Sequence, residues 1–461
     1  MPLYAGVCET NITPPVGVWM SGYGLRPTGA TSIHDELYAR ALVLDDGGQR
    51  VVLVSADIIA FAPDSVQRIR AEIASKLHAK PSAIMLHATH THGGPNVGIY
   101  RCMGERDSAY LDILERKIIG AAVQASHVLH PAHFTYGETA AQVGINRRES
   151  LKNGRTVLGT DFAGAVAPVV QSLCVNHTDG RLLALLFCHA CHPTTLGGEN
   201  LSITAEWCGV AVEQLKSRFR AEADSQHTSS LPLPFCLQGC CGDINPHPRG
   251  AWENVYQHGR VIGDAAHQAR WNSHGRLEET IDAEEETVSL PMLPPPSVAE
   301  CDAQVALYEE RLAKSRASNA HAGQILYDEG ILAWAQDYRR YAGLESFQET
   351  QEFAIQCLNL GGIQILGFPA EMFVQYQLDF SAQSRTPVLS LAYTNGCWNY
   401  LPTAEEYPRG GYEVNDANKY YGTLMFAPET EGIVRAAAYR LLGIPNPDTT
   451  PYPVLAGDAR R

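Results

Sequence analysis

The sequence predicts an α/β protein in which mixed β-sheets are sandwiched by helices. Two observations predict this class: a strand–turn–strand pattern that occurs three times, and long helical stretches between its copies. The copies lie at 37–57, 169–192 and 353–371, and each has a glycine-containing turn typical of a tight hairpin. Their second strands are almost continuously apolar, as expected for strands that are buried on both faces and covered by helices.

Apolar residues spaced three to four apart predict helices in the connecting segments. The expected helices are 65–77, 108–129, 205–220, 252–271 and 431–442. A long polar segment, 297–344, follows a run of three prolines and is rich in alanine and glutamate, which predicts a helical hairpin inserted into the α/β body. It is interpreted either as a solvated decoration or as a lid over a site. Because no linker-like stretch divides the chain, residues 1–461 are expected to form a single domain.

Composition excludes several classes of partner. The net charge is -15 and no run of Lys or Arg exceeds two, which argues against nucleic acid. No apolar run reaches the roughly 20 residues of a membrane-spanning helix. The first residues lack the features of a signal peptide, so the twelve cysteines are expected to be reduced thiols rather than disulfides, and the protein to be cytoplasmic. A homo-oligomer stays open.

The sharpest local motif is Ala-Thr-His-Thr-His-Gly-Gly-Pro at 88–95, after an apolar strand. On extended backbone His90 and His92 would project to the same side, an arrangement that suits metal binding or proton transfer. The alternative is a pair of hydrogen-bonded loop histidines. The apolar second strand of each strand–turn–strand copy is also followed by polar residues. These are Asp57 after the first copy, His189 and His192 after the second, and Glu371 after the third.

Cysteines near these segments raise two alternatives. Cys188 and Cys191 form a C-x-x-C pair, which could indicate a zinc-thiolate or redox site. The segment 235–247 runs from an apolar strand into a Gly-Cys-Cys-Gly-Asp turn that could aim backbone N–H groups at an oxyanion. Cys240 or Cys241 in this turn is a candidate nucleophile, although buried cysteines used as small apolar residues are the commoner case.

Taken together in this order, the segments resemble the catalytic domain of the neutral/alkaline, non-lysosomal ceramidases. The similarity extends from Asn-Ile-Thr-Pro-Pro at 11–15 to the Glu-Glu-Tyr loop at 405–407, nearly the whole chain. It implies a single ceramidase-like catalytic domain over 1–461 with the insertion at 297–344. The C-terminal immunoglobulin-like domain of the family is expected to be absent.

The resemblance implies a zinc ion with four ligands: His90, His192, Glu371 and Tyr407. The tyrosine is the one in Glu405-Glu406-Tyr407. By the same resemblance, His92 is a substrate-polarising or proton-transfer group. The arginine of the family's Asn-Arg-Ser motif corresponds to Arg147.

One departure from the family pattern changes the expected mechanism. Where the family carries a serine regarded as essential, this chain has Asn245, within Gly-Asp-Ile-Asn-Pro-His at 242–247. An amide cannot act as a hydroxyl nucleophile but can donate a hydrogen bond to an oxyanion. Metal-activated water is therefore expected to attack, with Asn245, Arg147 or loop N–H groups stabilising the oxyanion and Asp57 or Asp243 orienting an imidazole.

The predicted function is zinc-dependent hydrolysis of an amide or ester/lactone bond in a small soluble substrate. Arginines at 26, 147 and 409 hint that this substrate is anionic or polar. Two alternatives remain: a non-catalytic small-molecule-binding protein on the same scaffold, and a cysteine-dependent hydrolase.

Overall fold

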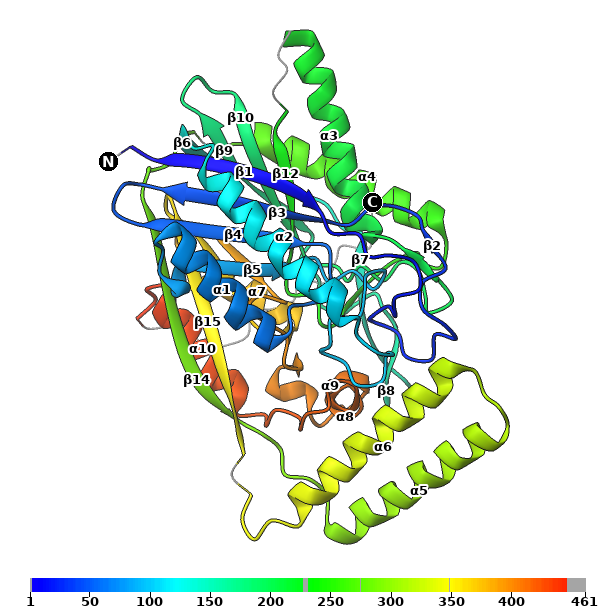
Figure 1. Cartoon of the computed structure of the whole chain (residues 1–461). Coiled ribbons are helices and arrows are strands. Elements are labelled where there is room, and N and C mark those ends of the chain that lie inside the picture. Colours follow the sequence, from blue (N-terminus) through cyan, green and yellow to red (C-terminus); the bar gives the residue numbers. More distant parts are fainter. Residues whose placement is uncertain (1, 227–230, 274, 348, 446–461) are drawn as a thin grey trace.

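Two facing β-sheets form the centre of the computed structural model, which describes residues 2–226, 231–273, 275–347 and 349–445 (Figure 1). The larger sheet has the order β12-β10-β9-β6-β1-β3-β4-β5, and the smaller one the order β14-β15-β16-β18. The large-sheet strands are β1 (Tyr4–Asn11), β3 (Tyr38–Asp45), β4 (Arg50–Ala56), β5 (Ile84–Ala88), β6 (His130–Ala140), β9 (Val169–His177), β10 (Leu182–His189) and β12 (Leu233–Gln238). The small-sheet strands are β14 (Ile281–Pro291), β15 (Thr350–Leu360), β16 (Ile363–Gly367) and β18 (Val388–Leu391).

The three predicted hairpins are confirmed as the antiparallel pairs β3–β4, β9–β10 and β15–β16. The second strand of each hairpin is followed by a helix and then by a strand that pairs parallel to it. These parallel pairs are β5 beside β4, β12 beside β10, and β18 beside β16. The sheets are mixed for this reason. The connecting helices are α1 (Pro63–Leu77), α3 (Glu206–Gln226) and α7 (Val374–Gln383).

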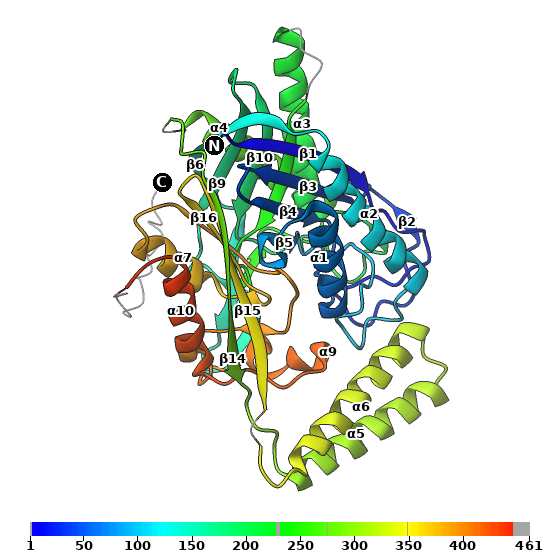
Figure 2. The same cartoon turned by 60° about the vertical axis from the view of Figure 1, so that its left-hand side comes forward.

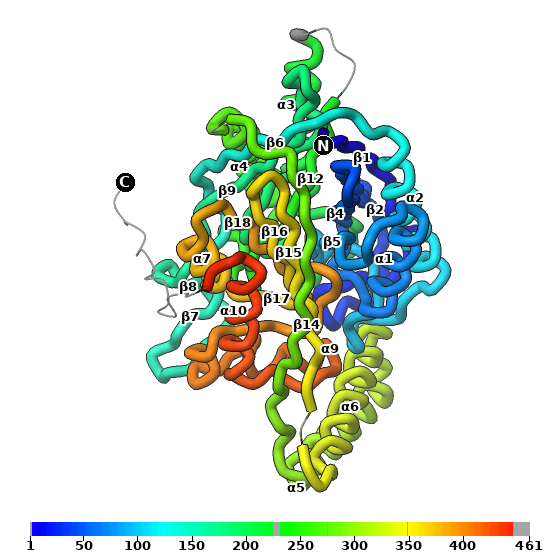
Figure 3. Tube along the Cα trace, turned by 90° about the vertical axis from the view of Figure 1, so that its left-hand side faces the viewer, coloured from blue at the N-terminus to red at the C-terminus, as the bar shows by residue number. Residues whose placement is uncertain are grey.

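Alternate residues of the strands face two different cores, as the two-residue period of a strand requires. Leu53, Leu186 and Ile365 belong to the apolar cluster between the two sheets. Val52 and Leu185 belong to the cluster shared with the helices. Helices α1, α2 (Ser108–Ser126), α3 and α4 (Trp252–Trp271) cover the large sheet, while α7 and α10 (Thr430–Leu441) lie on the outer side of the small one (Figure 3). The prediction of mixed sheets sandwiched by helices is confirmed.

The carboxyl ends of the parallel strands meet on one side of the molecule. Isolated bridges join His87 to Thr394 and Gly239 to Leu391, so the ends of β5, β12 and β18 are tied together. The loops that follow β5, β10, β12, β16 and β18 therefore converge, which is where open α/β sheets commonly place ligand sites. Short elements complete this region: β2 (Ser32–Ile33), β7 (Gly144–Ser150), β8 (Thr156–Asp161), β11 (Ser202–Ile203), β13 (Ile244–Pro246), β17 (Glu371–Met372), β19 (Tyr400–Leu401), α8 (Tyr412–Asn415) and α9 (Asn418–Tyr421).

The segment expected to be a helical insertion contains α5 (Val298–Ala317) and α6 (Ala322–Ala342), which project from the body beside α9 (Figure 2). Helix α6 packs closely on loops of the body at two glycines. A β-carbon at Gly323 would clash with the carbonyl oxygen of Arg26, and one at Gly330 would lie 2.7 Å from that of Arg101. The hydroxyls of Tyr327 and Tyr420 are 3.4 Å apart. The insertion therefore has a defined docking face.

None of the helices in the described part of the chain combines the length and the apolar character needed to cross a membrane.

Candidate metal centre

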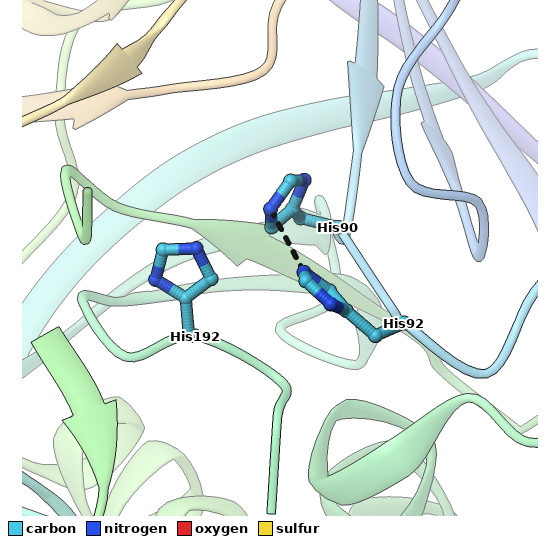
Figure 4. Close-up of side chains that lie close together, drawn as sticks. All are labelled: His90, His92 and His192. Carbon is cyan, nitrogen blue, oxygen red and sulfur yellow. Dashed lines mark hydrogen bonds between the residues drawn. The ribbon is translucent and has the colours of Figure 1, made fainter. Parts of the chain in front are cut away.

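Three buried or half-buried histidines, His90, His92 and His192, converge where β5 and β10 end (Figure 4). One ring nitrogen from each lies within 4.8 Å of those of the other two, so the group could hold a metal ion. The Nε2 atoms of His90 and His92 are 3.3 Å apart. His189 is not part of the group: its Nδ1 contacts the carbonyl of Val169 instead.

The two histidines of the 88–95 motif are brought together by a turn, so the expectation of extended backbone is wrong. β5 ends at Ala88, and His90 has φ 64°, in the left-handed region. Its ring stacks on that of Tyr393, which also has positive φ. A β-carbon on Gly22 would lie 2.3 Å from the His92 ring, so only glycine leaves room for that imidazole. Non-glycine residues held at positive φ often mark functional sites.

Hydrogen bonds fix which nitrogen of each ring is unprotonated. His90 Nδ1 lies 2.7 Å from the carbonyl oxygen of Ile59, and His192 Nδ1 lies 2.6 Å from that of Cys241. Because a carbonyl only accepts, both Nδ1 atoms must donate. In the neutral rings both Nε2 atoms then carry lone pairs, and they face Glu371 Oε2 at 3.5 Å and 3.0 Å. A bound cation would stabilise electron pairs that lie this close together.

Burial favours the neutral form of the His92 and His192 imidazoles. It lowers the pKa of His192 to about 4, with the charge of Arg147 acting in the same direction. Burial also holds the pKa of His92 well below its usual value. Neutral imidazole is the form that binds metal ions. The donor set at neutral pH is therefore nitrogen lone pairs and the Glu371 carboxylate.

The phenol predicted to join this group is placed elsewhere. The Tyr407 hydroxyl donates to the carbonyl of Phe426 at 2.9 Å. The hydroxyls that contact Glu371 belong to two other tyrosines: Tyr421 donates to Oε1, and Tyr393 lies 3.3 Å from Oε2 and 3.4 Å from His192 Nε2. Tyr407 follows a 3₁₀ turn at Ala404–Glu406. Tyr421 comes from α9, which the sequence reading missed.

Arg147 and Asn245 lie together beside the histidines, on the paired strands β7 and β13. Arg147 Nη1 donates to Asn245 Oδ1 at 3.1 Å, and its Nε donates to Glu413 Oε1 at 2.8 Å. Thr194 Oγ1 also donates to Asn245 Oδ1. With its oxygen committed to these donors, the amide NH₂ group of Asn245 is the part left for a ligand.

Neither aspartate orients an imidazole as expected. Asp57 accepts hydrogen bonds from Arg40 and from the hydroxyl of Thr89, behind the site. Asp243 accepts from the Val374 backbone N–H and from the Asn146 side chain, so it ties loops together. Backbone carbonyls orient the rings in place of carboxylates.

The cysteines give no sign of a nucleophile. Cys240 and Cys241 are fully buried, and burial raises the pKa of Cys241 to about 12. The thiolate is the reactive form of cysteine, and burial of this kind disfavours it. All twelve cysteines are unpaired.

A cavity of 230 Å³ opens beside the histidines. His92, Asn245 and Arg147 line it, together with Tyr23, Arg249 and three further tyrosines, Tyr400, Tyr412 and Tyr420. Arg409 is not among the lining residues: it pairs with Glu406. Arg249 was not singled out by sequence reasoning, because one exposed arginine in a loop carries no motif.

Comparisons with known proteins agree with this architecture. The crystal structure of neutral ceramidase from Pseudomonas aeruginosa superposes with a TM-score of 0.71 over 98% of this chain and 76% of that one, at 19% identity. A structure titled ceramidase complexed with C2 superposes with a TM-score of 0.70 over 99% of this chain and 78% of that one, at 17% identity. These two likenesses show the fold.

Sequence relatives point to the same family. The neutral ceramidase of Pseudomonas aeruginosa is 22% identical over 301 residues, which is 61% of this chain and 43% of the relative. That of Drosophila melanogaster is 35% identical over 259 residues, 53% of this chain and 36% of the relative. The chain thus matches less than half the length of these curated relatives. The sequence profile described as neutral/alkaline non-lysosomal ceramidase, N-terminal, matches residues 4–286. This chain belongs to the neutral/alkaline non-lysosomal ceramidase family.

Proposed function

We propose that this protein is a zinc-dependent hydrolase that cleaves an amide or ester/lactone bond of a small substrate with metal-activated water. The single observation that carries the proposal is the pair of Nε2 lone pairs, on His90 and His192, that face the Glu371 carboxylate inside the protein. The family membership of the chain makes hydrolysis the expected chemistry.

The donor set fits a zinc ion. Two imidazole nitrogens and a carboxylate oxygen are the ligands of many catalytic zinc sites, which leave a further position open. The Nδ1 hydrogen bonds of both ligating rings to carbonyl oxygens are of the kind that fixes ring orientation in metal sites. The hydroxyl of Tyr421 would hold the second oxygen of Glu371 in place. Bound here, zinc would polarise a carbonyl and lower the pKa of water to about 7.

The surrounding side chains have distinct tasks in the proposed reaction. Water adds to the scissile carbonyl, the bond to nitrogen or oxygen breaks, and one proton passes to the leaving group. The amide NH₂ of Asn245 donates to the carbonyl oxygen as negative charge develops there. Arg147 holds that amide through Asn245 Oδ1. His92 lines the cavity, and its Nδ1 is buried without a partner, so it is positioned to move the proton.

The volume of the cavity supports the proposal of a small substrate. Its 230 Å³ is below the roughly 300–1,000 Å³ of typical sites for drug-sized ligands. The unpaired cysteines support a reducing, cytoplasmic location.

Metal analysis of purified protein tests the proposal. We expect about one zinc per chain and loss of both zinc and turnover in the His90→Ala variant. His189→Ala is a matched control, since this buried histidine also follows an apolar strand but contacts Val169. Full zinc occupancy in His90→Ala, or loss of zinc in the control alone, would refute the ligand set.

A further inference from the structure

The cavity beside the histidines has an unusual charge for this chain. The protein as a whole has 50 acidic and 35 basic residues, a net charge of -15. The lining of this cavity nevertheless contains Arg147 and Arg249 and no aspartate or glutamate among the described residues. The cavity is therefore more positive than the surface around it.

The two arginines are not equally available to a ligand. Arg147 is buried, forms an ion pair with Glu413 at 2.8 Å, and donates to Asn245 and to the hydroxyl of Tyr400. Its charge and its hydrogen bonds are already used within the protein. Its role is to hold the amide of Asn245.

Arg249 is the available cation. It is exposed at the cavity, and no described carboxylate lies within ion-pair distance of its guanidinium. Its Nη2 donates to the hydroxyl of Tyr23 at 3.3 Å, and that hydroxyl donates to the carbonyl of Leu196 at 2.7 Å. One guanidinium edge is thus anchored, and the remaining N–H groups have no carboxylate partner.

The backbone around Arg249 is also fixed. The carbonyl of Pro248 accepts a hydrogen bond from His258 Nε2 at 2.7 Å. The N–H of Gly250 donates to the carbonyl of Thr195 at 2.7 Å. A cation held on both sides loses little freedom when it binds an anion, which favours recognition.

Tyr23 sets the spacing between this cation and the reacting groups. Its hydroxyl end meets Arg249, and its ring lies edge-on to the ring of His92 with centroids 5.0 Å apart. A single tyrosine ring therefore separates the cation from the proposed catalytic histidine. A ligand that reaches both would carry an anionic group only a few bonds from its scissile carbonyl.

We infer that the substrate is a small amide, ester or lactone that bears a carboxylate, and that Arg249 pairs with this carboxylate while the scissile carbonyl faces His92. An N-acyl amino acid has this spacing. The inference rests on the proposed function for the place of the carbonyl. Arginine is suited to the task because its planar fork matches a carboxylate.

Matched neutral and anionic probes test the inference by calorimetry. The probes are N-acylglycines with acyl chains from acetyl to hexanoyl, each beside its uncharged glycinamide. We expect the carboxylate member of a pair to bind at least about ten-fold more tightly, and Arg249→Gln to remove this preference. Arg218→Gln is the control for net charge, because Arg218 lies on α3 and pairs with Asp264 at the surface. This variant should keep the preference.

A second variant separates recognition from general damage to the site. Tyr23→Phe keeps the ring beside His92 but removes the hydroxyl that holds Arg249. It should raise KM several-fold more for the acylglycine than for the matched glycinamide, whereas general damage to the site would raise both equally. Equal binding of both probes, a preference that survives Arg249→Gln, or binding of neither series would overturn the inference.

The binding experiment is repeated on zinc-stripped protein, so that the two proposals fail separately. If the protein as purified binds no zinc, even when zinc is added, and has no turnover, but still prefers the acylglycine through Arg249, the proposed function alone is refuted. Zinc-dependent turnover without a carboxylate preference would refute only the assignment of the substrate class.

Discussion

Asn245 shows how one side chain changes the chemistry of a site without changing its shape. Its Oδ1 accepts from Arg147 and Thr194, and its NH₂ group remains for the ligand. In the proposed reaction it stabilises charge but forms no bond to the substrate. Loss of this residue should therefore lower the rate of turnover without abolishing it.

Substitution of Asn245 by alanine should therefore lower kcat on the order of 10²-fold, as for loss of one oxyanion donor. His192→Ala should cost more, because it removes a proposed metal ligand. Steady-state kinetics on one substrate, with zinc content measured in both variants, would check this order. A larger loss in Asn245→Ala, at unchanged zinc content, would contradict the assigned role.

Glu206 is a buried acidic residue whose raised pKa should make the stability of the protein depend on pH. It begins α3 with φ 60°, and its carboxylate accepts from the backbone N–H groups of Leu196 and Trp207. Burial raises its pKa to about 7, against those hydrogen bonds. The folded protein thus binds this proton more tightly than the unfolded chain does. Its contribution to stability is complete below pH 4.5 and is lost as pH rises toward 7.

The Glu206→Gln variant should remove this dependence. Between pH 5 and 7 the unfolding free energy of the unsubstituted protein should fall relative to that of the variant, on the order of 2 kcal/mol. Urea unfolding at several pH values would measure the difference. Asp243, whose pKa burial also raises to about 7, titrates equally in both proteins and cancels. Parallel curves for the two proteins would contradict the prediction.

Sequence reasoning reached some side chains of the site and missed others for physical reasons. His90, His192 and Glu371 follow apolar strands, and buried strands end at fixed places in a fold. The left-handed turn at His90 has no such signal, because glycine is absent from that position. The phenol was assigned to Tyr407 by motif, but the loop 405–421 contains several tyrosines. Contacts between distant residues decide which of them reaches Glu371: the Tyr407 hydroxyl bonds to Phe426 and that of Tyr421 bonds to Glu371.

The helices and strands also divide into those that the sequence predicts and those that depend on contacts between distant residues. Apolar periodicity located the three hairpins and the long helices, and these were found with end errors of a few residues. The short helices α8 and α9 were missed, because four residues give no period. The polar segment 297–344 was correctly expected to be helical, but the sequence did not predict which face of it packs on the body. Two glycines and Tyr327 on α6 form that face, and only contacts across the chain reveal it.

Helix α6 depends on the small size of Gly330. A β-carbon there would lie 2.7 Å from the carbonyl oxygen of Arg101 and 2.8 Å from Cys102. Gly330→Leu should therefore displace the helix, lower the melting temperature by several degrees and raise KM through Tyr420 and the cavity wall. Ala333→Leu, at an exposed position of the same helix, is the control and should change neither quantity. Equal effects in both variants would contradict this packing.

At the scale of the whole molecule, the proposed metal ligands come from three distant parts of the chain. His90 follows β5, His192 follows β10 and Glu371 begins β17. An ion bound to all three favours the folded state, since the unfolded chain cannot bring them together. The gain is about 4 kcal/mol when the free ion is at 1,000 times its Kd.

Removal of the ion should accordingly lower the melting temperature. A chelator added to the zinc-loaded protein should shift thermal unfolding down by several degrees, and added zinc should restore it. The His90→Ala variant should already melt at the lower temperature and should not respond to the chelator. A chelator effect that persists in this variant would place the ion elsewhere.

The separation of these three segments also has a consequence for biosynthesis. When the first 200 residues have left the ribosome, both imidazoles exist, but the carboxylate that faces them is still about 170 residues away in translation. The nascent chain consequently lacks the complete set of proposed ligands, so it cannot yet bind a metal ion at this site. If these residues bind an ion as proposed, its selection would be deferred until the small sheet has closed onto the large one, and the geometry of the folded site would then decide which ion is retained.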